Sequence, residues 1–239
     1  MLILGLNKTT LLDYPEHVAA TIFTGGCNLR CPFCHNRDLV LARESIDAGI
    51  ITPYSEDEIL SFLKKRRGIL TGVCITGGEP TLHQDLPLFL SRIKELGMLV
   101  KLDTNGFRPD VLHHLLDEKL IDYCAIDIKN SPVHYAATVG LSSIDLGPLR
   151  ESVDCLLSLN GSFPYEFRTT IVKELHSEED MYAIREWIAG ADQYFLQSYT
   201  DSDQVISSGY HAHDTDTLQH FASICRQTIP NVQLRGIDL

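Results

Sequence analysis

Three cysteines lie close together in the first part of this 239-residue chain. Cys27, Cys31 and Cys34 are separated by three and by two residues, whereas the other four cysteines are scattered. Thiolates at this density favour a soft metal. Zinc would need a fourth ligand to complete a tetrahedron, and the adjacent His35 is poorly placed to bind the same ion as Cys34. An iron–sulfur cluster fits better, because three cysteines would leave one iron open to another ligand.

Two glycines and a carboxylate form a second candidate motif. Gly77 and Gly78 directly precede Glu79. Glycines allow a backbone to approach a ligand closely, and a carboxylate can accept hydrogen bonds from an ammonium group. The same tripeptide is also compatible with an ordinary turn.

Further polar residues end or interrupt apolar runs. Asp103 to Asn105 follow one run, and an Asx turn between strand and helix is the simpler interpretation. Asp127 and Lys129 close the next run, where a surface ion pair is the alternative. Arg168 lies inside a run, where a charge is costly unless it meets a partner or a polar cavity.

Composition excludes several classes of function. Acidic residues number 32 and basic residues 20, so the net charge of -12 has the wrong sign for binding nucleic acid or an anionic membrane. No uncharged apolar run approaches the roughly 18 residues that span a bilayer, and no basic segment precedes the first apolar one. The odd number of cysteines and their spacing do not suit a disulfide framework, so we expect a reducing compartment, the cytoplasm.

Strand-like runs alternate with amphipathic helical segments, which predicts parallel strands with crossover helices. Two of the expected helices begin at Ser55 and Ser177, which have capping spacing to Glu58 and Asp180. The expected strands are residues 18–24, 73–76, 99–103, 123–129, 167–172 and 194–197, with a short closing strand at 232–234.

Six such units are too few for the eight of a full TIM barrel, and no linker interrupts them, so we expect a partial (β/α)6 barrel. We expect a single domain over residues 1–239, with a short extension at about 1–17 and a cysteine loop at 25–36. Most of the motifs above accumulate at the carboxyl ends of strands, where such barrels place their functional residues. Cys74, Cys124, Cys155 and Cys225 are expected in the core.

The spacing of the three cysteines, with Phe33 before the last, resembles the signature of radical S-adenosylmethionine (SAM) enzymes. That resemblance implies a 4Fe-4S cluster on Cys27, Cys31 and Cys34, with the amino and carboxylate groups of SAM on the fourth iron. It places Phe33 beside the adenine. Reduction would cleave SAM to methionine and a 5'-deoxyadenosyl radical, chemistry that belongs to the cofactors.

The other motifs resemble SAM contacts of the same family. Gly77, Gly78 and Glu79 resemble its clamp for the amino group of SAM. Residues 103–106 and 127–129 resemble motifs of glycyl-radical-activating enzymes, which implies that Lys129 meets the methionine carboxylate. The same resemblance implies a monovalent cation near Asp103, Thr104 and Asp127. The further candidate SAM contacts are Asn105, Arg168 (alternatively a peptide contact), Gln197 and Tyr199.

The N-terminal part of the sequence indicates which kind of radical SAM enzyme the chain resembles. Residues 5–15 and 24–36 resemble the longer form of the anaerobic ribonucleoside-triphosphate reductase activating proteins, and residues 102–107 are also similar to the pyruvate formate-lyase activating enzyme. Asp13 and His35 match positions that contact the substrate backbone in that relative, although the spacing from the aspartate to the first cysteine differs by one residue. The implied reaction removes hydrogen from a glycine Cα of a partner enzyme.

The implied partners are a glycyl-radical enzyme and an electron donor such as flavodoxin or ferredoxin, with no nucleic acid and no membrane. Three alternatives stay open at the level of sequence. The chain could activate pyruvate formate-lyase or another glycyl-radical enzyme, or it could act on a peptide or small metabolite. A zinc-bearing interaction module is the alternative that is not an enzyme.

Overall fold

The computed structural model describes residues 1–237, which form two compact units. The first unit comprises residues 1–28, 36–104 and 108–124. The second comprises residues 29–35, 105–107 and those from 125 onward. The cysteine loop is therefore divided, with Cys27 in the first unit and Cys31 and Cys34 in the second.

Short apolar runs rich in β-branched residues form the strands of the first unit. Strand β1 (Ile3–Thr10) runs antiparallel to β2 (Ala19–Thr24). Strands β2, β3 (Gly72–Gly77) and β4 (Leu99–Thr104) are parallel neighbours. Strand β1 therefore lies within the expected N-terminal extension at about 1–17.

Strands β6 (Tyr165–Ile171), β7 (Tyr194–Ser198) and β8 (Val232–Arg235) are parallel neighbours in the second unit. Strand β5 (Tyr123–Asp127) contributes residues to both units. In the described part of the chain the sheet order is β1 to β8, an open and mostly parallel arrangement that confirms the predicted fold class. The six predicted parallel strands are β2 to β7, and the short closing strand is β8.

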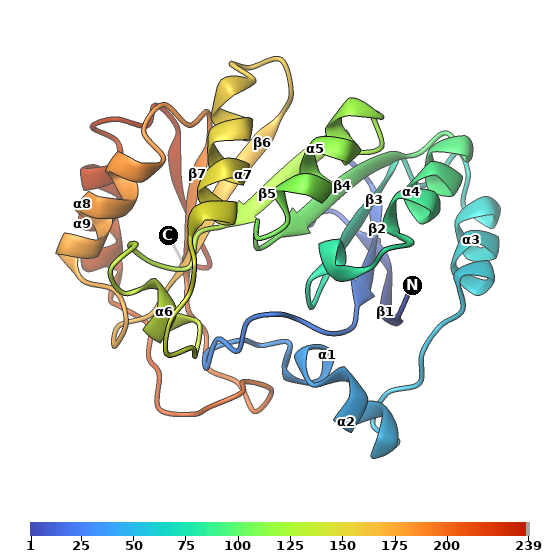
Figure 1. The fold of residues 1–239 in the computed structure, drawn as a ribbon, viewed down its shortest axis with the longest axis horizontal. Helices are drawn as coiled ribbons and strands as arrows, with labels where there is room; N and C mark the ends of the chain where they lie inside the picture. The colour runs from blue at the N-terminus through green and yellow to red at the C-terminus, as the bar shows by residue number, and fades with distance from the viewer. Residues whose placement is uncertain (238–239) are drawn as a thin grey trace. The chain divides into compact units, whose positions relative to one another are not determined.

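Helices connect the strands, and Figure 1 shows α3 beside α4 in the first unit and α8 beside α9 in the second. None of the helices within residues 1–237 is long and apolar enough to cross a bilayer. The helices are α1 (Arg37–Val40), α2 (Ala42–Asp47), α3 (Glu56–Lys65), η1 (Pro80–Leu82), α4 (Leu86–Glu95), α5 (Pro109–Asp117), α6 (Tyr135–Thr138), α7 (Gly147–Ser158), α8 (Glu178–Trp187) and α9 (Thr215–Cys225).

The strand register of the first unit separates an apolar face from a polar one. Ile22, Ile75 and Leu102 are aligned across β2, β3 and β4, and all three are fully buried. Because side chains alternate along a strand, their sequence neighbours share the opposite face. That face carries the aligned row of Thr21, Cys74 and Lys101.

An apolar cluster occupies the same face as this polar row, nearer the amino ends of the strands. It consists of Tyr14, Ala19 and Tyr123, with Leu99 packed against it. The scattered cysteines follow their predicted burial at Cys74, Cys124 and Cys225, whereas Cys155 on α7 is only half-buried.

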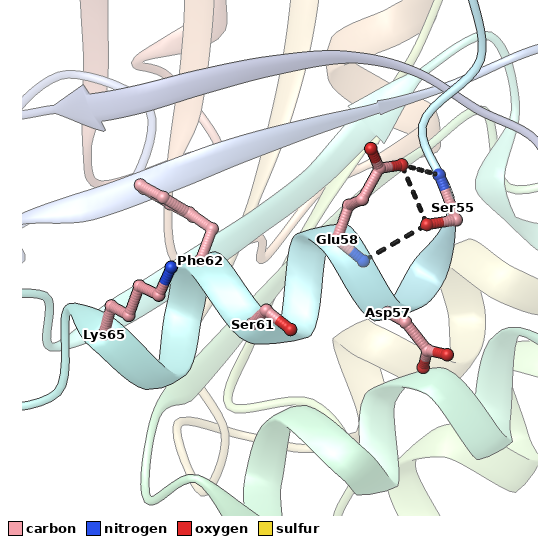
Figure 2. A pocket seen from close by; sticks show the side chains of 6 residues that line it. All are labelled: Ser55, Asp57, Glu58, Ser61, Phe62 and Lys65. Carbon is pink, nitrogen blue, oxygen red and sulfur yellow. Dashed lines mark hydrogen bonds between the residues drawn. The ribbon is translucent and has the colours of Figure 1, made fainter.

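Both predicted capping boxes form. The Ser55 hydroxyl accepts a hydrogen bond from the Glu58 amide at 3.2 Å, and the Glu58 carboxylate accepts one from the Ser55 amide at 2.8 Å (Figure 2). Ser177 and Asp180 form the same pair of bonds at the start of α8. The pocket in Figure 2 is lined only by α3 and its capping residue and contains none of the predicted site residues.

We predict that Ser55→Ala lowers the free energy of unfolding by about 1 kcal/mol, because it leaves helix amides without their cap. The expected decrease in Tm is about 2–4 °C for a chain of this size. Differential scanning fluorimetry is the measurement, and Ser61→Ala, on the exposed part of the same helix, is the matched control. Equal Tm values for the two variants would contradict the role of the cap.

Candidate functional site

Glu79 ties the carboxyl end of β3 to that of β4 within the first unit. Its side chain is 1% exposed. One carboxylate oxygen accepts hydrogen bonds from the Thr81 amide at 3.1 Å and from the Thr104 hydroxyl at 2.6 Å. A buried carboxylate is tolerated only with such partners. The sequence pattern therefore found a residue whose placement is fixed by the fold.

The two glycines before Glu79 are required by contacts with the chain's own backbone. Gly77 has φ +119°, a conformation that favours glycine. A Cβ on Gly78 would lie 2.0 Å from the carbonyl oxygen of Gly26. That carbonyl accepts a hydrogen bond from the Glu79 amide at 2.8 Å. The close approach expected toward a ligand is thus, at Gly78, an approach to the start of the cysteine loop.

Two further bonds hold the first-unit part of the cysteine loop. The Gly26 amide donates to the Leu39 carbonyl at 2.7 Å, and the Asn36 side chain donates to the Gly77 carbonyl at 3.2 Å. Cys27, which follows Gly26, is half-buried. Its backbone is therefore anchored next to the Gly-Gly-Glu turn.

Lys101 is a residue that the sequence analysis missed. Its side chain is 2% exposed, and its ammonium forms an ion pair with the Asp103 carboxylate on the same strand. It also lies 5.7 Å from the centre of the Tyr123 ring. The sequence contained a signal for this residue, because a lysine inside an apolar strand, like Arg168, needs a partner or a polar cavity.

Asn105 forms the Asx turn that was the simpler interpretation. Its side-chain oxygen accepts a hydrogen bond from the Phe107 amide at 3.2 Å. The next residue, Gly106, accepts a bond from the Ser152 hydroxyl of α7 at 2.7 Å. Both Asn105 and Gly106 are buried, so this turn packs firmly within the second unit.

Cys31 and Cys34 belong to one turn, in which the Cys34 amide donates to the Cys31 carbonyl at 3.0 Å. The same turn accepts two backbone hydrogen bonds from a distant segment. The Ile206 amide donates to the Cys34 carbonyl at 3.3 Å, and the Ser207 amide donates to the Pro32 carbonyl at 2.8 Å. Phe33, expected beside the adenine, is 4% exposed. The turn that carries the two thiols is thus held by hydrogen bonds from residues 206 and 207.

A network of acidic and basic side chains begins at Asp127, the last residue of β5. Asp127 accepts hydrogen bonds from Lys129 at 3.1 Å and from Arg168 at 2.9 Å. Arg168 also lies 3.8 Å from Glu166, which Arg235 contacts through two bonds of 3.1 Å. Arg168 therefore has the partners that its position inside a strand demanded. The sequence analysis missed Glu166 and Arg235.

These charges shift the ionisation of their neighbours. Burial alone would raise the pKa of the Asp127 carboxyl, but the positive charges of Arg168 and Lys129 hold it well below its usual value. Burial would lower the pKa of the Lys129 ammonium, but Asp127 and the thiolates of Cys31 and Cys34 raise it. Lys129 therefore carries its positive charge within electrostatic range of Cys31 and Cys34 in the second unit.

Buried polar side chains fix the backbone at Lys129. His176 is 3% exposed, accepts a hydrogen bond from the Val172 amide at 3.0 Å and donates to the Lys129 carbonyl at 2.8 Å. Asn130 is fully buried and donates to the Thr138 hydroxyl at 2.7 Å. The segment after β5 is therefore attached to the end of β6 and to α6.

The residues predicted at the end of β7 divide into two groups. Tyr199 is buried and stacks on His35, with ring centres 5.4 Å apart. Burial and the nearby Asp201 raise the pKa of Tyr199 to about 12. His35 also contacts the Thr200 carbonyl. Gln197, in contrast, is exposed.

Asp13 lies on the polar face of the first unit. Its carboxylate accepts a hydrogen bond from Thr21, and Thr21 belongs to the row that continues through Cys74 to Lys101. The structure therefore associates Asp13 with Lys101 and Asp103 on one face, an arrangement that sequence spacing did not show.

None of the seven cysteines, all of which lie within residues 1–237, forms a disulfide. Within residues 1–237, no group of three or more His, Cys, Asp or Glu side chains is arranged as ligands of a metal ion. Cys27 belongs to a different unit from Cys31 and Cys34, so the three-thiol set stays a prediction.

Solved structures share this open, mostly parallel sheet. Streptococcus suis SuiB bound to S-adenosylmethionine has a TM-score of 0.67 at 15% identity, covering 89% of this chain and 49% of its own. QueE from Escherichia coli has a TM-score of 0.55 at 14% identity, and the match covers 99% of this chain and 92% of QueE. This chain spans about half the length of SuiB.

Sequence comparison gives the family directly. The model of the Radical SAM superfamily matches residues 21–140. A protein of Methanocaldococcus jannaschii, named as a candidate glycyl-radical enzyme activating enzyme, is 32% identical over 99% of this chain and 97% of its own. The chain belongs to the Radical SAM superfamily, whose members use an iron–sulfur cluster and SAM.

We predict that His176 gives the protein a measurable dependence of stability on pH. Burial lowers the pKa of His176, so below about pH 6.5 the unfolded chain binds a proton that the folded chain does not. The free energy of unfolding therefore falls as the pH drops through this range, by at most about 1.4 kcal/mol per pH unit, and is constant above it.

His176→Gln keeps a donor of similar reach toward the Lys129 carbonyl but removes this titration. Urea unfolding of the metal-free protein at pH 7.5 and 5.5 should show a smaller decrease for the variant than for the wild type. His114→Gln, at an exposed position of α5, is the control. An unchanged decrease in the His176 variant would contradict the prediction.

Proposed function

We propose that this protein is a radical SAM activating enzyme that generates a glycyl radical on a partner enzyme, the anaerobic ribonucleoside-triphosphate reductase. The observation that carries the proposal is the full-length similarity to the M. jannaschii relative, whose name assigns it to glycyl-radical enzyme activation. The resemblance of residues 5–15 and 24–36 to the reductase activating proteins supports the choice of partner.

The chain's donor set suits the proposed 4Fe-4S cluster. No disulfide engages Cys27, Cys31 or Cys34, and a single turn holds Cys31 and Cys34. Thiolates are the cysteine form that binds iron. When bound, the reduced cluster would supply the electron that cleaves the sulfonium of SAM.

The SAM-binding roles that we propose follow the family resemblance of the motifs. Glu79 would accept hydrogen bonds from the amino group and Lys129 would pair with the carboxylate, since Asp127 and Arg168 hold the Lys129 side chain in place. The proposed contacts to the rest of SAM are Phe33, Gly77, Gly78, Asp103, Asn105, Arg168, Gln197 and Tyr199.

Asp13 and His35 are the proposed contacts to the substrate backbone. In the first unit, Leu11 and Leu12, which precede Asp13, are 72% and 88% exposed. Exposed apolar side chains beside a candidate contact suit a protein substrate. We further propose that residues 1–239 act as one radical SAM domain, that flavodoxin or ferredoxin donates the electron, and that the protein works in the cytoplasm, where cysteines stay reduced.

The decisive experiment combines two measurements on anaerobically reconstituted protein. Electron paramagnetic resonance of the reduced protein should show a 4Fe-4S signal that changes when SAM is added. Incubation with SAM, reductant and the anaerobic reductase of the same genome should then produce a glycyl radical signal on the reductase. Cys31→Ser should abolish both signals. Cys155→Ser, at a half-buried position of α7, should leave them intact.

Each outcome has a definite meaning. A SAM-sensitive cluster that activates pyruvate formate-lyase but not the reductase would replace the partner. A SAM-sensitive cluster that cleaves SAM only with a free peptide or a small metabolite would overturn the activase assignment. One bound zinc, with no iron or sulfide, would establish the interaction module instead.

Glu79→Gln tests the proposed amino-group contact. Removing the charge while keeping the shape should weaken SAM binding at least tenfold, because bonds to a charged group are worth about 1.5–3 kcal/mol. Equilibrium dialysis with labelled SAM gives the dissociation constant. Glu118→Gln, at an exposed position after α5, is the control, and equal affinities for the two variants would exclude the contact.

A further inference from the structure

Asp103 already has a positive partner within the chain. The Lys101 ammonium forms an ion pair with its carboxylate, and both residues belong to β4, two positions apart. Side chains at this spacing point to the same face of the sheet. Lys101 is 2% exposed and Asp103 is 12% exposed at the side chain, so water screens this pair only weakly.

The expected cation ligands are engaged in other interactions. The Thr104 hydroxyl donates its proton to Glu79 at 2.6 Å. In the second unit, the Asp127 carboxylate receives Lys129 and Arg168. Each carboxylate that the resemblance associates with a monovalent cation is therefore balanced by a lysine or arginine of its own unit. This arrangement does not fit a site built for a free alkali-metal ion.

The surroundings of Lys101 explain why it stays at this position. Its backbone is aligned with Cys74 on β3 and Thr21 on β2, which places it in the polar row. The ammonium lies 5.7 Å from the centre of the Tyr123 ring, whose face attracts a cation. An ammonium fixed in this way supplies the unit charge that an alkali-metal ion would supply, and dilution cannot remove it.

We propose that Lys101 is a built-in counter-ion for Asp103 that replaces a free monovalent cation and positions this carboxylate in the SAM site. The assignment to SAM rests on the proposed function, whereas the counter-ion role itself does not. Lys101 acts through Asp103 and is therefore a positioning residue.

A double-mutant cycle on the metal-free protein tests the counter-ion role without any cofactor. Lys101→Met leaves a buried carboxylate without its ammonium and should lower Tm by roughly 6–20 °C. Asp103→Asn should also destabilise the protein, and the double variant should recover at least half of the loss, because no unpaired charge remains. Lys94→Met, which removes the more exposed partner of Asp122, is the matched control.

Strictly additive effects in this cycle would overturn the proposal. The wild-type Tm should also be equal in potassium chloride and in tetramethylammonium chloride of the same ionic strength. A wild-type protein that potassium specifically stabilises would contain the free cation site that the proposal denies.

SAM affinity extends the test to the loaded protein. The wild-type dissociation constant for SAM should agree within about twofold in potassium, sodium and tetramethylammonium salts, whereas Lys101→Met should weaken binding at least tenfold in tetramethylammonium. A tenfold cation dependence in the wild type, or unchanged affinity in the variant, would overturn the proposal. Absence of any SAM binding would contradict the proposed function, and the stability cycle would then decide the counter-ion role by itself.

Discussion

Charges buried near the carboxyl ends of the strands must be neutralised inside the protein, and this constraint organises both units. Glu79 is satisfied by hydroxyl and amide donors, Asp103 by Lys101, and Asp127 by Lys129 and Arg168. Leaving the buried Glu79 carboxylate without a partner would cost several kcal/mol. Strands β4 and β5 must keep their register, because a shift of one residue would turn Asp103 or Asp127 to the opposite face.

The periodicity of the sequence predicted most of this fold. The apolar runs of β2 to β7 and the capping residues Ser55 and Ser177 are local signals, and local signals can be recognised without a structure. Strand β1 was missed because its apolar start at Ile3 and Leu4 gives way to the exposed polar residues 7–9, which interrupt the pattern of a strand. The bonds of Arg235 to Glu166 join residues 69 positions apart, and no local pattern contains such a pair.

The candidate site shows the same division between local and distant signals. Motif spacing singled out Glu79, Asp127, Lys129 and the cysteines, and the structure gives three of these charged residues direct partners. His176 was missed because its function depends on reaching the carbonyl of Lys129, 47 residues away. Lys101 was missed although its signal was local, since a lysine in a strand is usually assigned to the solvent face.

The contact between Gly78 and the Gly26 carbonyl has a consequence for the evolution of this chain. The two motifs are separated by 52 residues, and position 78 cannot accept a Cβ while the Gly26 carbonyl keeps its place. A substitution at position 78 would become tolerable only after the backbone of the cysteine loop had moved. Homologous sequences should therefore change these two motifs together, and the order in which the changes can accumulate is restricted.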